Sequence, residues 1–177
     1  VTPRSPTLVI AGERGFLPMS LGLNSAYIAS HWEAVQEGAD RTGKTPSRQD
    51  WRIVRDVYVA ETDAEAREQA LHGMLGRVWR EYLLPLFDSF QLLTVFKHDP
   101  DVPDREVTPE YLMEHLWLVG SPKTVVEKLE HLYEAAGGFG TLLMLVYDHW
   151  EQQQGWENSM RLLAAEVMPQ VANRTPA

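Results

Sequence analysis

The segment Gly120–Val171, GSPKTVVEKLEHLYEAAGGFGTLLMLVYDHWEQQQGWENSMRLLAAEVMPQV, decides the fold. Ser121-Pro122 opens an amphipathic pattern with helical spacing, and Gly137 stops it. The apolar run 141–147 is typical of a buried strand, and a final helix follows it. Helix, glycine stop, strand and helix together predict one repeat of an α/β protein, in which ligands gather at the carboxyl ends of the strands.

Polar and aromatic side chains follow this strand directly, as Asp148-His149-Trp150. A histidine at the carboxyl end of a parallel strand can donate a proton near neutral pH, so His149 is our candidate catalytic residue. Neighbouring residues of a strand point to opposite faces, and we therefore do not expect Asp148 to bind His149 automatically. A cap or loop contact is the alternative role for His149.

The rest of the chain predicts further helices and strands in alternation. Thr62-Asp63-Ala64-Glu65 has the residues of a capping box, which predicts one long helix up to about Leu84 that Pro85 ends. The β-branched and aromatic residues of 51–60 predict a strand. The remaining expected elements are a brief helix from Thr7 that Gly15 stops, a short strand at 16–21, a helix from Asn24 or Ser25 to Thr42, and a helix opened by Thr108-Pro109.

A long connection, residues 88–107, separates two of the predicted helices. Its first part is apolar, and its second part is polar and contains prolines. A connection of this length is uncommon unless it forms a lid or a binding loop, which is our expectation for 88–107. A surface excursion anchored by Phe87, Phe90 and Phe96 is the alternative.

Composition excludes several classes of function. The chain has 177 residues, a net charge of -9 and no cysteine. Scattered basic residues argue against a nucleic-acid surface, and the short apolar runs argue against a membrane span. The lack of cysteine excludes thiol chemistry and fits a cytoplasmic location. No metal spacing of histidines, GxSxG elbow, Walker A loop or GxGxxG motif occurs, so we expect no metal site.

One weak phosphate motif lies at the start of the chain. Arg4-Ser5-Pro6-Thr7 directly precedes an expected helix start. Backbone N–H groups and hydroxyls at a helix N-terminus form a natural phosphate site, and a guanidinium beside them strengthens it. Gly137-Gly138-Phe139-Gly140 lies on the wrong side of its strand for that purpose, and we interpret it as a helix stop.

In order and spacing these pieces resemble the carboxyl-terminal half of the bacterial luciferase-like flavin monooxygenases, nearest to the limonene-type and luciferase-type enzymes. The resemblance covers nearly the whole chain. Its segments are Ser5-Pro6, Ala11-Gly12-Glu13-Arg14-Gly15, Met19-Ser20-Leu21-Gly22, His31-Trp32, Trp51-Arg52, Val59-Ala60-Glu61-Thr62, Trp117-Leu118-Val119-Gly120-Ser121-Pro122, Gly137-Gly138-Phe139-Gly140-Thr141 and Glu166-Val167-Met168-Pro169.

The resemblance implies an α/β fold, the carboxyl-terminal portion of a (β/α)8 TIM barrel with an insertion. Residues 1–177 would form one partial barrel domain, about strands 6–8 with their helices, and 88–107 would be its lid. The implied activity is that of a two-component monooxygenase, which takes reduced FMN from a separate flavin reductase and uses O2 to oxygenate an apolar small molecule. A lid suits such chemistry, because the reactive flavin must be shielded from water.

By position, the resemblance also assigns cofactor residues. Arg4, Ser5 and Thr7 match the loop that holds the flavin phosphate. Met19 and Ser20 would lie near the flavin, at the end of the next barrel strand. Most catalytic groups of the family lie in strands that have no counterpart here, which leaves the catalytic residues open and His149 the only candidate.

The chain is about half as long as the family's usual chains. Three strands cannot close a barrel, so we expect either a piece of a longer chain or a short relative that pairs with a second copy or another subunit. Whether this chain is an enzyme by itself is therefore open. A non-catalytic half-barrel or flavin-binding subunit is the first alternative function, and a deazaflavin-dependent oxidoreductase that transfers hydride is the second.

Overall fold

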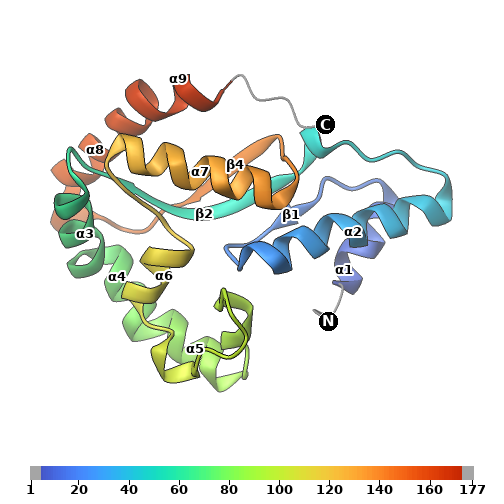
Figure 1. The fold of residues 1–177 in the computed structure, drawn as a ribbon, viewed down its shortest axis with the longest axis horizontal. Helices are drawn as coiled ribbons and strands as arrows, with labels where there is room; N and C mark the ends of the chain where they lie inside the picture. The colour runs from blue at the N-terminus through green and yellow to red at the C-terminus, as the bar shows by residue number, and fades with distance from the viewer. Residues whose placement is uncertain (1–4, 173–177) are drawn as a thin grey trace.

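The computed structural model describes residues 5–172, which form a mixed α/β fold around a parallel sheet (Figure 1). The central strand is β2 (Arg52–Val59), and each of the remaining strands pairs with it in parallel. Strand β1 (Met19–Ser20) aligns Ser20 with Ile53, and β4 (Thr141–Leu145) aligns Leu145 with Asp56. Strand β3 (Leu118–Gly120) aligns Gly120 with Val59, at the carboxyl end of β2.

Strands β1 and β3 share one edge of β2, and β4 occupies the other. Backbone N–H groups of successive strand residues point to opposite edges. The N–H groups of Arg52 and Ala60, both even positions, donate to Pro18 beside β1 and to Gly120 in β3. Trp51, an odd position, accepts from Thr141 of β4. The carboxyl end of β2 is therefore flanked by β3 on one side and by the chain leaving β4 on the other.

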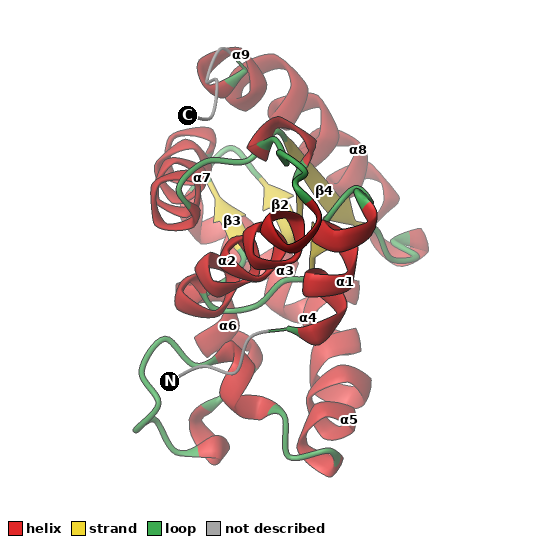
Figure 2. Cartoon of the chain, turned by 90° about the vertical axis from the view of Figure 1, so that its right-hand side faces the viewer, coloured by secondary structure: helices red, strands yellow, loops and turns green. Residues whose placement is uncertain are grey.

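Helices cover one face of this sheet, as Figure 2 shows from the side. The odd residues of β2 pack on this face against α1 (Pro6–Arg14), α2 (Ser25–Thr42), α7 (Pro122–Ala136) and α8 (Gln153–Leu162). Buried residues of the main core include Trp51, Ile53, Val57 and Val59.

A second core lies beneath the carboxyl end of β2. It joins Tyr58 of β2 to Trp79, Phe96 and Trp117. Its helices are α3 (Asp63–His72), α4 (Met74–Val78), α5 (Leu84–Ser89) and α6 (Pro109–His115), which occupy the lower part of Figure 1. A π-turn at Trp79–Leu83 connects α4 to α5, and another at Leu163–Val167 connects α8 to α9 (Met168–Val171).

Local capping signals placed most helix ends correctly. The side chains of Asn24, Thr108 and Ser121 cap α2, α6 and α7, and each accepts a bond from a backbone N–H three residues on. Gly15, Gly43 and Gly137 end α1, α2 and α7 in the left-handed conformation, which glycine adopts without a steric penalty.

The single long helix predicted over 64–84 is wrong. Thr62 does cap its start, but the helix ends at Gly73 and a second one begins at Met74. Gly73 adopts an extended conformation at this break, where an added Cβ would overlap the carbonyl of Gln69 and the side chain of Gln152. Pro85 lies within the first turn of α5 and ends nothing, because the π-turn before it already changes the hydrogen-bond pattern.

Helices α1 and α2 cross at two glycines. A Cβ at Gly12 would overlap the carbonyl of Val35, and a Cβ at Gly38 would overlap the carbonyl of Val9. The two backbones therefore touch without side chains between them. This contact fixes α1, and with it the N-terminal turn that carries Ser5 and Thr7, against the rest of the fold.

In the described part of the chain, the helices are too short or too polar for any of them to cross a bilayer.

Candidate functional site

The carboxyl ends of β2 and β4 bring a buried carboxylate and a phenol together. The hydroxyl of Tyr147 donates to Oδ1 of Asp56 over 2.7 Å, although the two residues are 91 positions apart. The β2–β4 register places Tyr147 just beyond the partner of Asp56, which is Leu145. Trp79 of the second core lies beside this pair, and its buried indole N–H interacts with the Asp56 carboxylate.

The surroundings of the pair raise the pKa of both Asp56 and Tyr147. Burial raises the pKa of Asp56 to about 6, against the opposing effects of the Tyr147 hydroxyl, the Trp79 indole and the Arg55 guanidinium. Burial, and then the nearby Asp56 charge, raises the pKa of Tyr147. Asp56 thus titrates near neutral pH while Tyr147 keeps its proton, a combination that can hold or release a proton at the Asp56 carboxylate.

His149 joins this region as a buried ring. It stacks on Trp156 with ring centroids 4.2 Å apart, and its centroid lies 6.1 Å from that of Tyr58. Its Nδ1 has no hydrogen-bond partner, and burial lowers the pKa of His149. Asp148 accepts from the backbone N–H of Trp150 and forms no bond to His149, as the strand geometry suggested. His149 is therefore a neutral ring whose unpartnered Nδ1 is enclosed within the fold.

The first turn of α1 carries two of the phosphate candidates. Ser5 occupies the N-cap position, but its side chain makes no capping bond, so its hydroxyl is not consumed by the helix. Thr7 is exposed in the first turn, after Pro6. A nine-residue helix with an unused N-cap hydroxyl suits an oxyanion. Arg4, the third candidate, lies outside the described residues.

Met19 and Ser20, the remaining cofactor candidates, differ in their surroundings. The Met19 side chain is 52% exposed at the end of β1. Ser20 is fully buried, and its hydroxyl lies 2.9 Å from Nδ1 of His31 and accepts from the indole of Trp51. Its side chain is therefore turned toward α2 and held there. Only the backbone of Ser20 remains for a ligand on the other face.

The predicted lid segment 88–107 is anchored in its middle and at its carboxyl end, where Val107 is buried in the second core. Leu93 and Phe96 are buried in the second core, where Phe96 packs edge-on against Phe87 and Trp79. The carbonyl of Val95 accepts from both the backbone and the side-chain amide of Asn24, which ties the segment to the start of α2. Phe90, in contrast, is 65% exposed.

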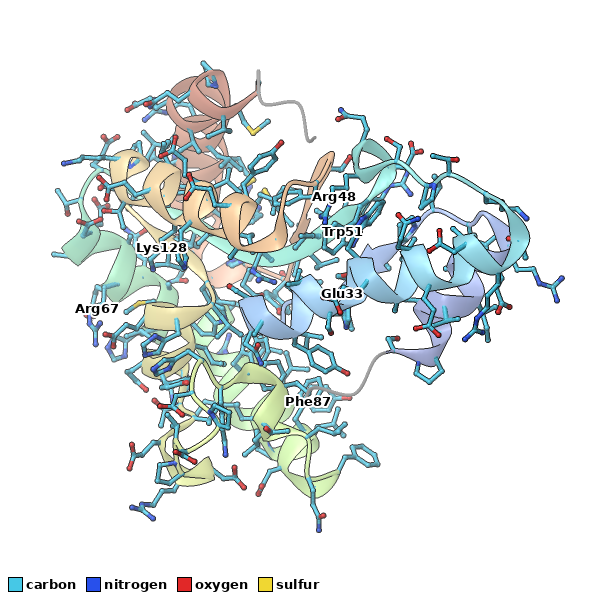
Figure 3. All side chains as sticks on the ribbon, turned by 45° about the vertical axis from the view of Figure 1, so that its right-hand side comes forward. Glu33, Arg48, Trp51, Arg67, Phe87 and Lys128 are labelled. Atoms are coloured by element: carbon cyan, nitrogen blue, oxygen red, sulfur yellow. The ribbon has the colours of Figure 1, made fainter. Side chains whose placement is uncertain are left out.

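The glycines of 137–140 lie at the opposite end of β2. The guanidinium of Arg48 donates to the carbonyls of Ala136 and Gly138 and lies over the rings of Trp32 and Trp51. Figure 3 shows Arg48 and Trp51 together at this end, well away from Arg67. The glycines therefore stop a helix at the amino end of the strand, as predicted, and form no phosphate cradle.

Sequence patterns did not predict that Asp56, Tyr147 and Trp79 form a group. The available signal was a carboxylate, Asp56, inside a strand rich in β-branched residues, since a buried carboxylate is uncommon without a function. Among residues 5–172, no cluster of three or more histidine, aspartate or glutamate side chains is arranged to hold a metal ion.

The chain is similar to known proteins over most of its length. A family model described as luciferase-like monooxygenase matches residues 4–138. Two Pseudomonas putida proteins are similar over almost the whole chain: 3,6-diketocamphane 1,6-monooxygenase is 34% identical over 94% of it, and 2,5-diketocamphane 1,2-monooxygenase 1 is 35% identical over 97%. The chain covers 44% and 48% of these relatives, so it spans about half their length.

A solved structure agrees with this match. The oxygenating constituent of 3,6-diketocamphane monooxygenase from the CAM plasmid of Pseudomonas putida, a type II Baeyer-Villiger monooxygenase in complex with FMN, superimposes with a TM-score of 0.90. The match covers 98% of this chain and 48% of that one, at 33% identity.

Proposed function

Because the chain belongs to the luciferase-like monooxygenase family, we propose that it forms part of an FMN-dependent monooxygenase that oxygenates an apolar small molecule with O2. The observation that carries this proposal is the superposition on an FMN-bound Baeyer-Villiger monooxygenase over 98% of the chain. We further propose that residues 1–177 correspond to about strands 6–8 of a (β/α)8 barrel. The substrate class follows from the diketocamphane relatives, which suggest a bicyclic terpenoid ketone.

The residues present fit a phosphorylated flavin at the N-terminus of α1. The Ser5 hydroxyl, which makes no capping bond, and the exposed Thr7 would hold the phosphate. Arg4 would supply positive charge. Reduced FMN would supply the electrons that activate O2. The exposed Met19 would offer apolar contact to the ring system.

Asp56, Tyr147 and His149 would control protons and orientation in this site. Asp56 would hold a proton that its near-neutral pKa allows it to release, and Tyr147 would fix the orientation of the carboxyl group. His149, stacked on Trp156, would help to position Tyr147 and Tyr58 beside this site. The segment 88–107, anchored at Phe96, would exclude water as a lid.

The proposed partners follow from the same family chemistry. A separate flavin reductase would deliver reduced FMN, and the cysteine-free composition is compatible with a cytoplasmic location. We also propose association with a second copy or a complementing polypeptide. Exposed apolar side chains at the ends of β1 and β4 support this: Met19, Leu21, Leu145 and Val146.

The same exposed residues favour a second candidate, a non-catalytic half-barrel or flavin-binding subunit that needs a partner. A third candidate is a deazaflavin-dependent oxidoreductase that transfers hydride. Titration with FMN and with a deazaflavin, each followed by its absorbance spectrum, separates the third candidate from the first.

Replacing Ser5 or Thr7 by alanine is expected to weaken FMN binding about tenfold or more, because each hydroxyl would donate to a charged phosphate. Calorimetric titration measures the loss. Riboflavin, which lacks the phosphate, is the matched control ligand, and its affinity should not change. Thr45→Ala, at an exposed loop position, is the control variant. Equal loss for FMN and riboflavin would place the phosphate elsewhere.

A further inference from the structure

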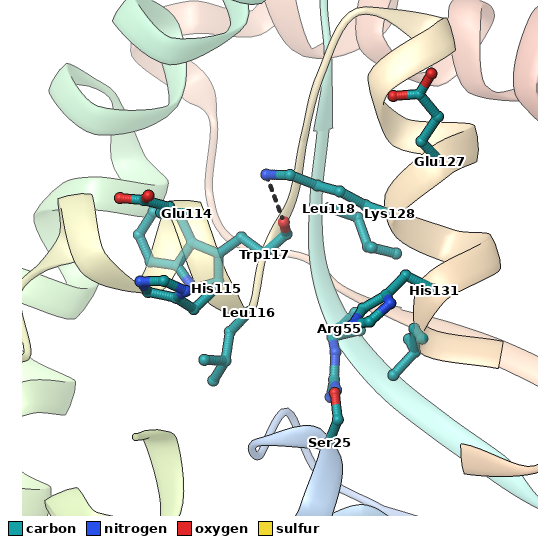
Figure 4. Close-up of a pocket in the computed structure, with 11 residues that line it drawn as sticks. Ser25, Arg55, Glu114, His115, Leu116, Trp117, Leu118, Glu127, Lys128 and His131 are labelled. Carbon is teal, nitrogen blue, oxygen red and sulfur yellow. Dashed lines mark hydrogen bonds between the residues drawn. The ribbon is translucent and has the colours of Figure 1, made fainter. Parts of the chain in front are cut away.

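A cavity of about 250 Å³ lies between α2, β2, α6 and α7, on the helix-covered face of the sheet (Figure 4). The proposed flavin site does not include it, because Arg55 faces this cavity while the neighbouring Asp56 faces the Tyr147 side. Ser25, Lys128 and His131 also line it. The cavity is thus separated from Asp56 by the thickness of one strand.

Arg55 is a buried cation without a carboxylate partner on its own face. Arg55 is 3% exposed. Within the described chain its guanidinium donates only to the backbone carbonyls of Val54 and Leu23. A guanidinium has five N–H donors, and these two bonds leave the others to the cavity. Burial lowers the pKa of Arg55 to about 10, so it stays charged at neutral pH. Asp56, on the opposite face, attracts this charge but makes no hydrogen bond to it, so the guanidinium has unused donors and no carboxylate in contact with it.

The surroundings of Arg55 suit an anion. Helix α2 begins at this end of the cavity, and the N–H groups of Ser25 and Ala26 have no acceptor within the helix because they open it. Figure 4 shows the Ser25 hydroxyl and the Arg55 guanidinium pointing toward one another, with His131 next to them. His131 is exposed and forms the mouth.

The other charged side chains of the cavity do not compete for this position. Lys128 already donates to three backbone carbonyls, those of Met113, Trp117 and Val119. Glu114 and Glu127 line the cavity but lie at its far sides from Arg55 in Figure 4. The Arg55 end of the cavity is therefore the part whose positive charge has no carboxylate in contact with it.

We propose that this cavity is a second ligand site that binds a small oxyanion, a phosphate or a carboxylate, between Arg55, Ser25, His131 and the N-terminus of α2. The site is separate from the flavin phosphate position at Ser5 and Thr7, and it does not depend on the proposed function. Binding at this site also affects Asp56 on the other face of the sheet through its charge. An anion beside Arg55 cancels part of the positive charge that stabilises the Asp56 carboxylate, so its binding raises the pKa of Asp56.

Titration of the flavin-free protein with inorganic phosphate, and separately with acetate, tests the site. Calorimetry and the ring resonances of His131 should show saturable binding with a dissociation constant of about 1 mM or tighter for at least one of the two anions. Arg55→Gln should weaken that binding at least about tenfold. The Ser5→Ala/Thr7→Ala double variant should leave it unchanged. In the phosphate-saturated protein the Asp56 titration should move to higher pH, and Arg55→Gln should remove that movement.

If Arg55→Gln does not fold, the Ser25→Ala/His131→Gln double variant decides, because neither side chain is buried. Undiminished binding in that variant, or in a folded Arg55→Gln protein, overturns the proposal. Shifts of His131 that sodium chloride reproduces at equal ionic strength overturn it too, since they reflect screening alone. Loss of binding in the Ser5→Ala/Thr7→Ala variant would assign the anion to the flavin phosphate position instead.

Discussion

Asp56→Asn is expected to stabilise the protein at pH 8 by about 2 kcal/mol, although it removes a buried charged group. Burial raises the pKa of Asp56 from 3.8 to about 6, so the folded state binds the proton more tightly than the unfolded state does. The stability from this proton is complete below the unfolded pKa and is lost as pH rises through the folded one. The loss amounts to about 3 kcal/mol between about pH 4 and about pH 6.

Asparagine carries no charge at any pH in this range, and its Oδ1 can still accept from the Tyr147 hydroxyl. Urea unfolding of both proteins from pH 4 to pH 8 should show curves that meet at the acid end and separate as pH rises. Asp88→Asn, at an exposed position, is the control and should not change the pH dependence. A variant that is less stable than the parent at pH 8 would contradict the raised pKa. A buried carboxylate that lowers the stability of the folded protein is expected to have a functional role.

Gly38→Ala is expected to destabilise the protein by about 3 kcal/mol. In an ordinary helix this change is favourable by about 1 kcal/mol, because alanine is the better helix former. Here the added Cβ overlaps the carbonyl of Val9, so α1 and α2 must separate. Urea unfolding measures the loss. FMN affinity should fall in parallel, because α1 carries the Ser5 and Thr7 hydroxyls.

Gly22→Ala is the matched control. A Cβ at Gly22 meets its nearest atom, the Val54 carbonyl, at 3.5 Å, which is an ordinary contact. We expect a change within about 0.5 kcal/mol. A Gly38→Ala protein as stable as the parent would show that the helices do not cross in contact.

Local signals predicted much of the fold, because capping and glycine stops act within a few residues. Asn24, Thr108 and Gly137 each mark the helix end that their side chain or backbone conformation creates. The break at Gly73 was not predicted, because a glycine inside a helical pattern does not by itself end the helix, and here the backbone turns extended at that residue.

The site was predictable only in part. Ser5 and Thr7 lie beside a helix start that the sequence shows. Asp56 and Tyr147 meet because β2 and β4 pair in one register, and a shift of one residue would turn Asp56 to the helix-covered face. The orientation of Ser20 toward His31 and Trp51 likewise depends on which face β1 buries.

The most direct test of the proposed oxygenation uses isotopically labelled oxygen. The protein, loaded with enzymatically reduced FMN and checked by titration to hold it, is mixed with a bicyclic terpenoid ketone under ¹⁸O₂, and the product is analysed by mass spectrometry. The product is expected to gain one ¹⁸O atom. A ketone recovered unchanged from protein that holds reduced FMN, or converted to an alcohol without ¹⁸O, would contradict it.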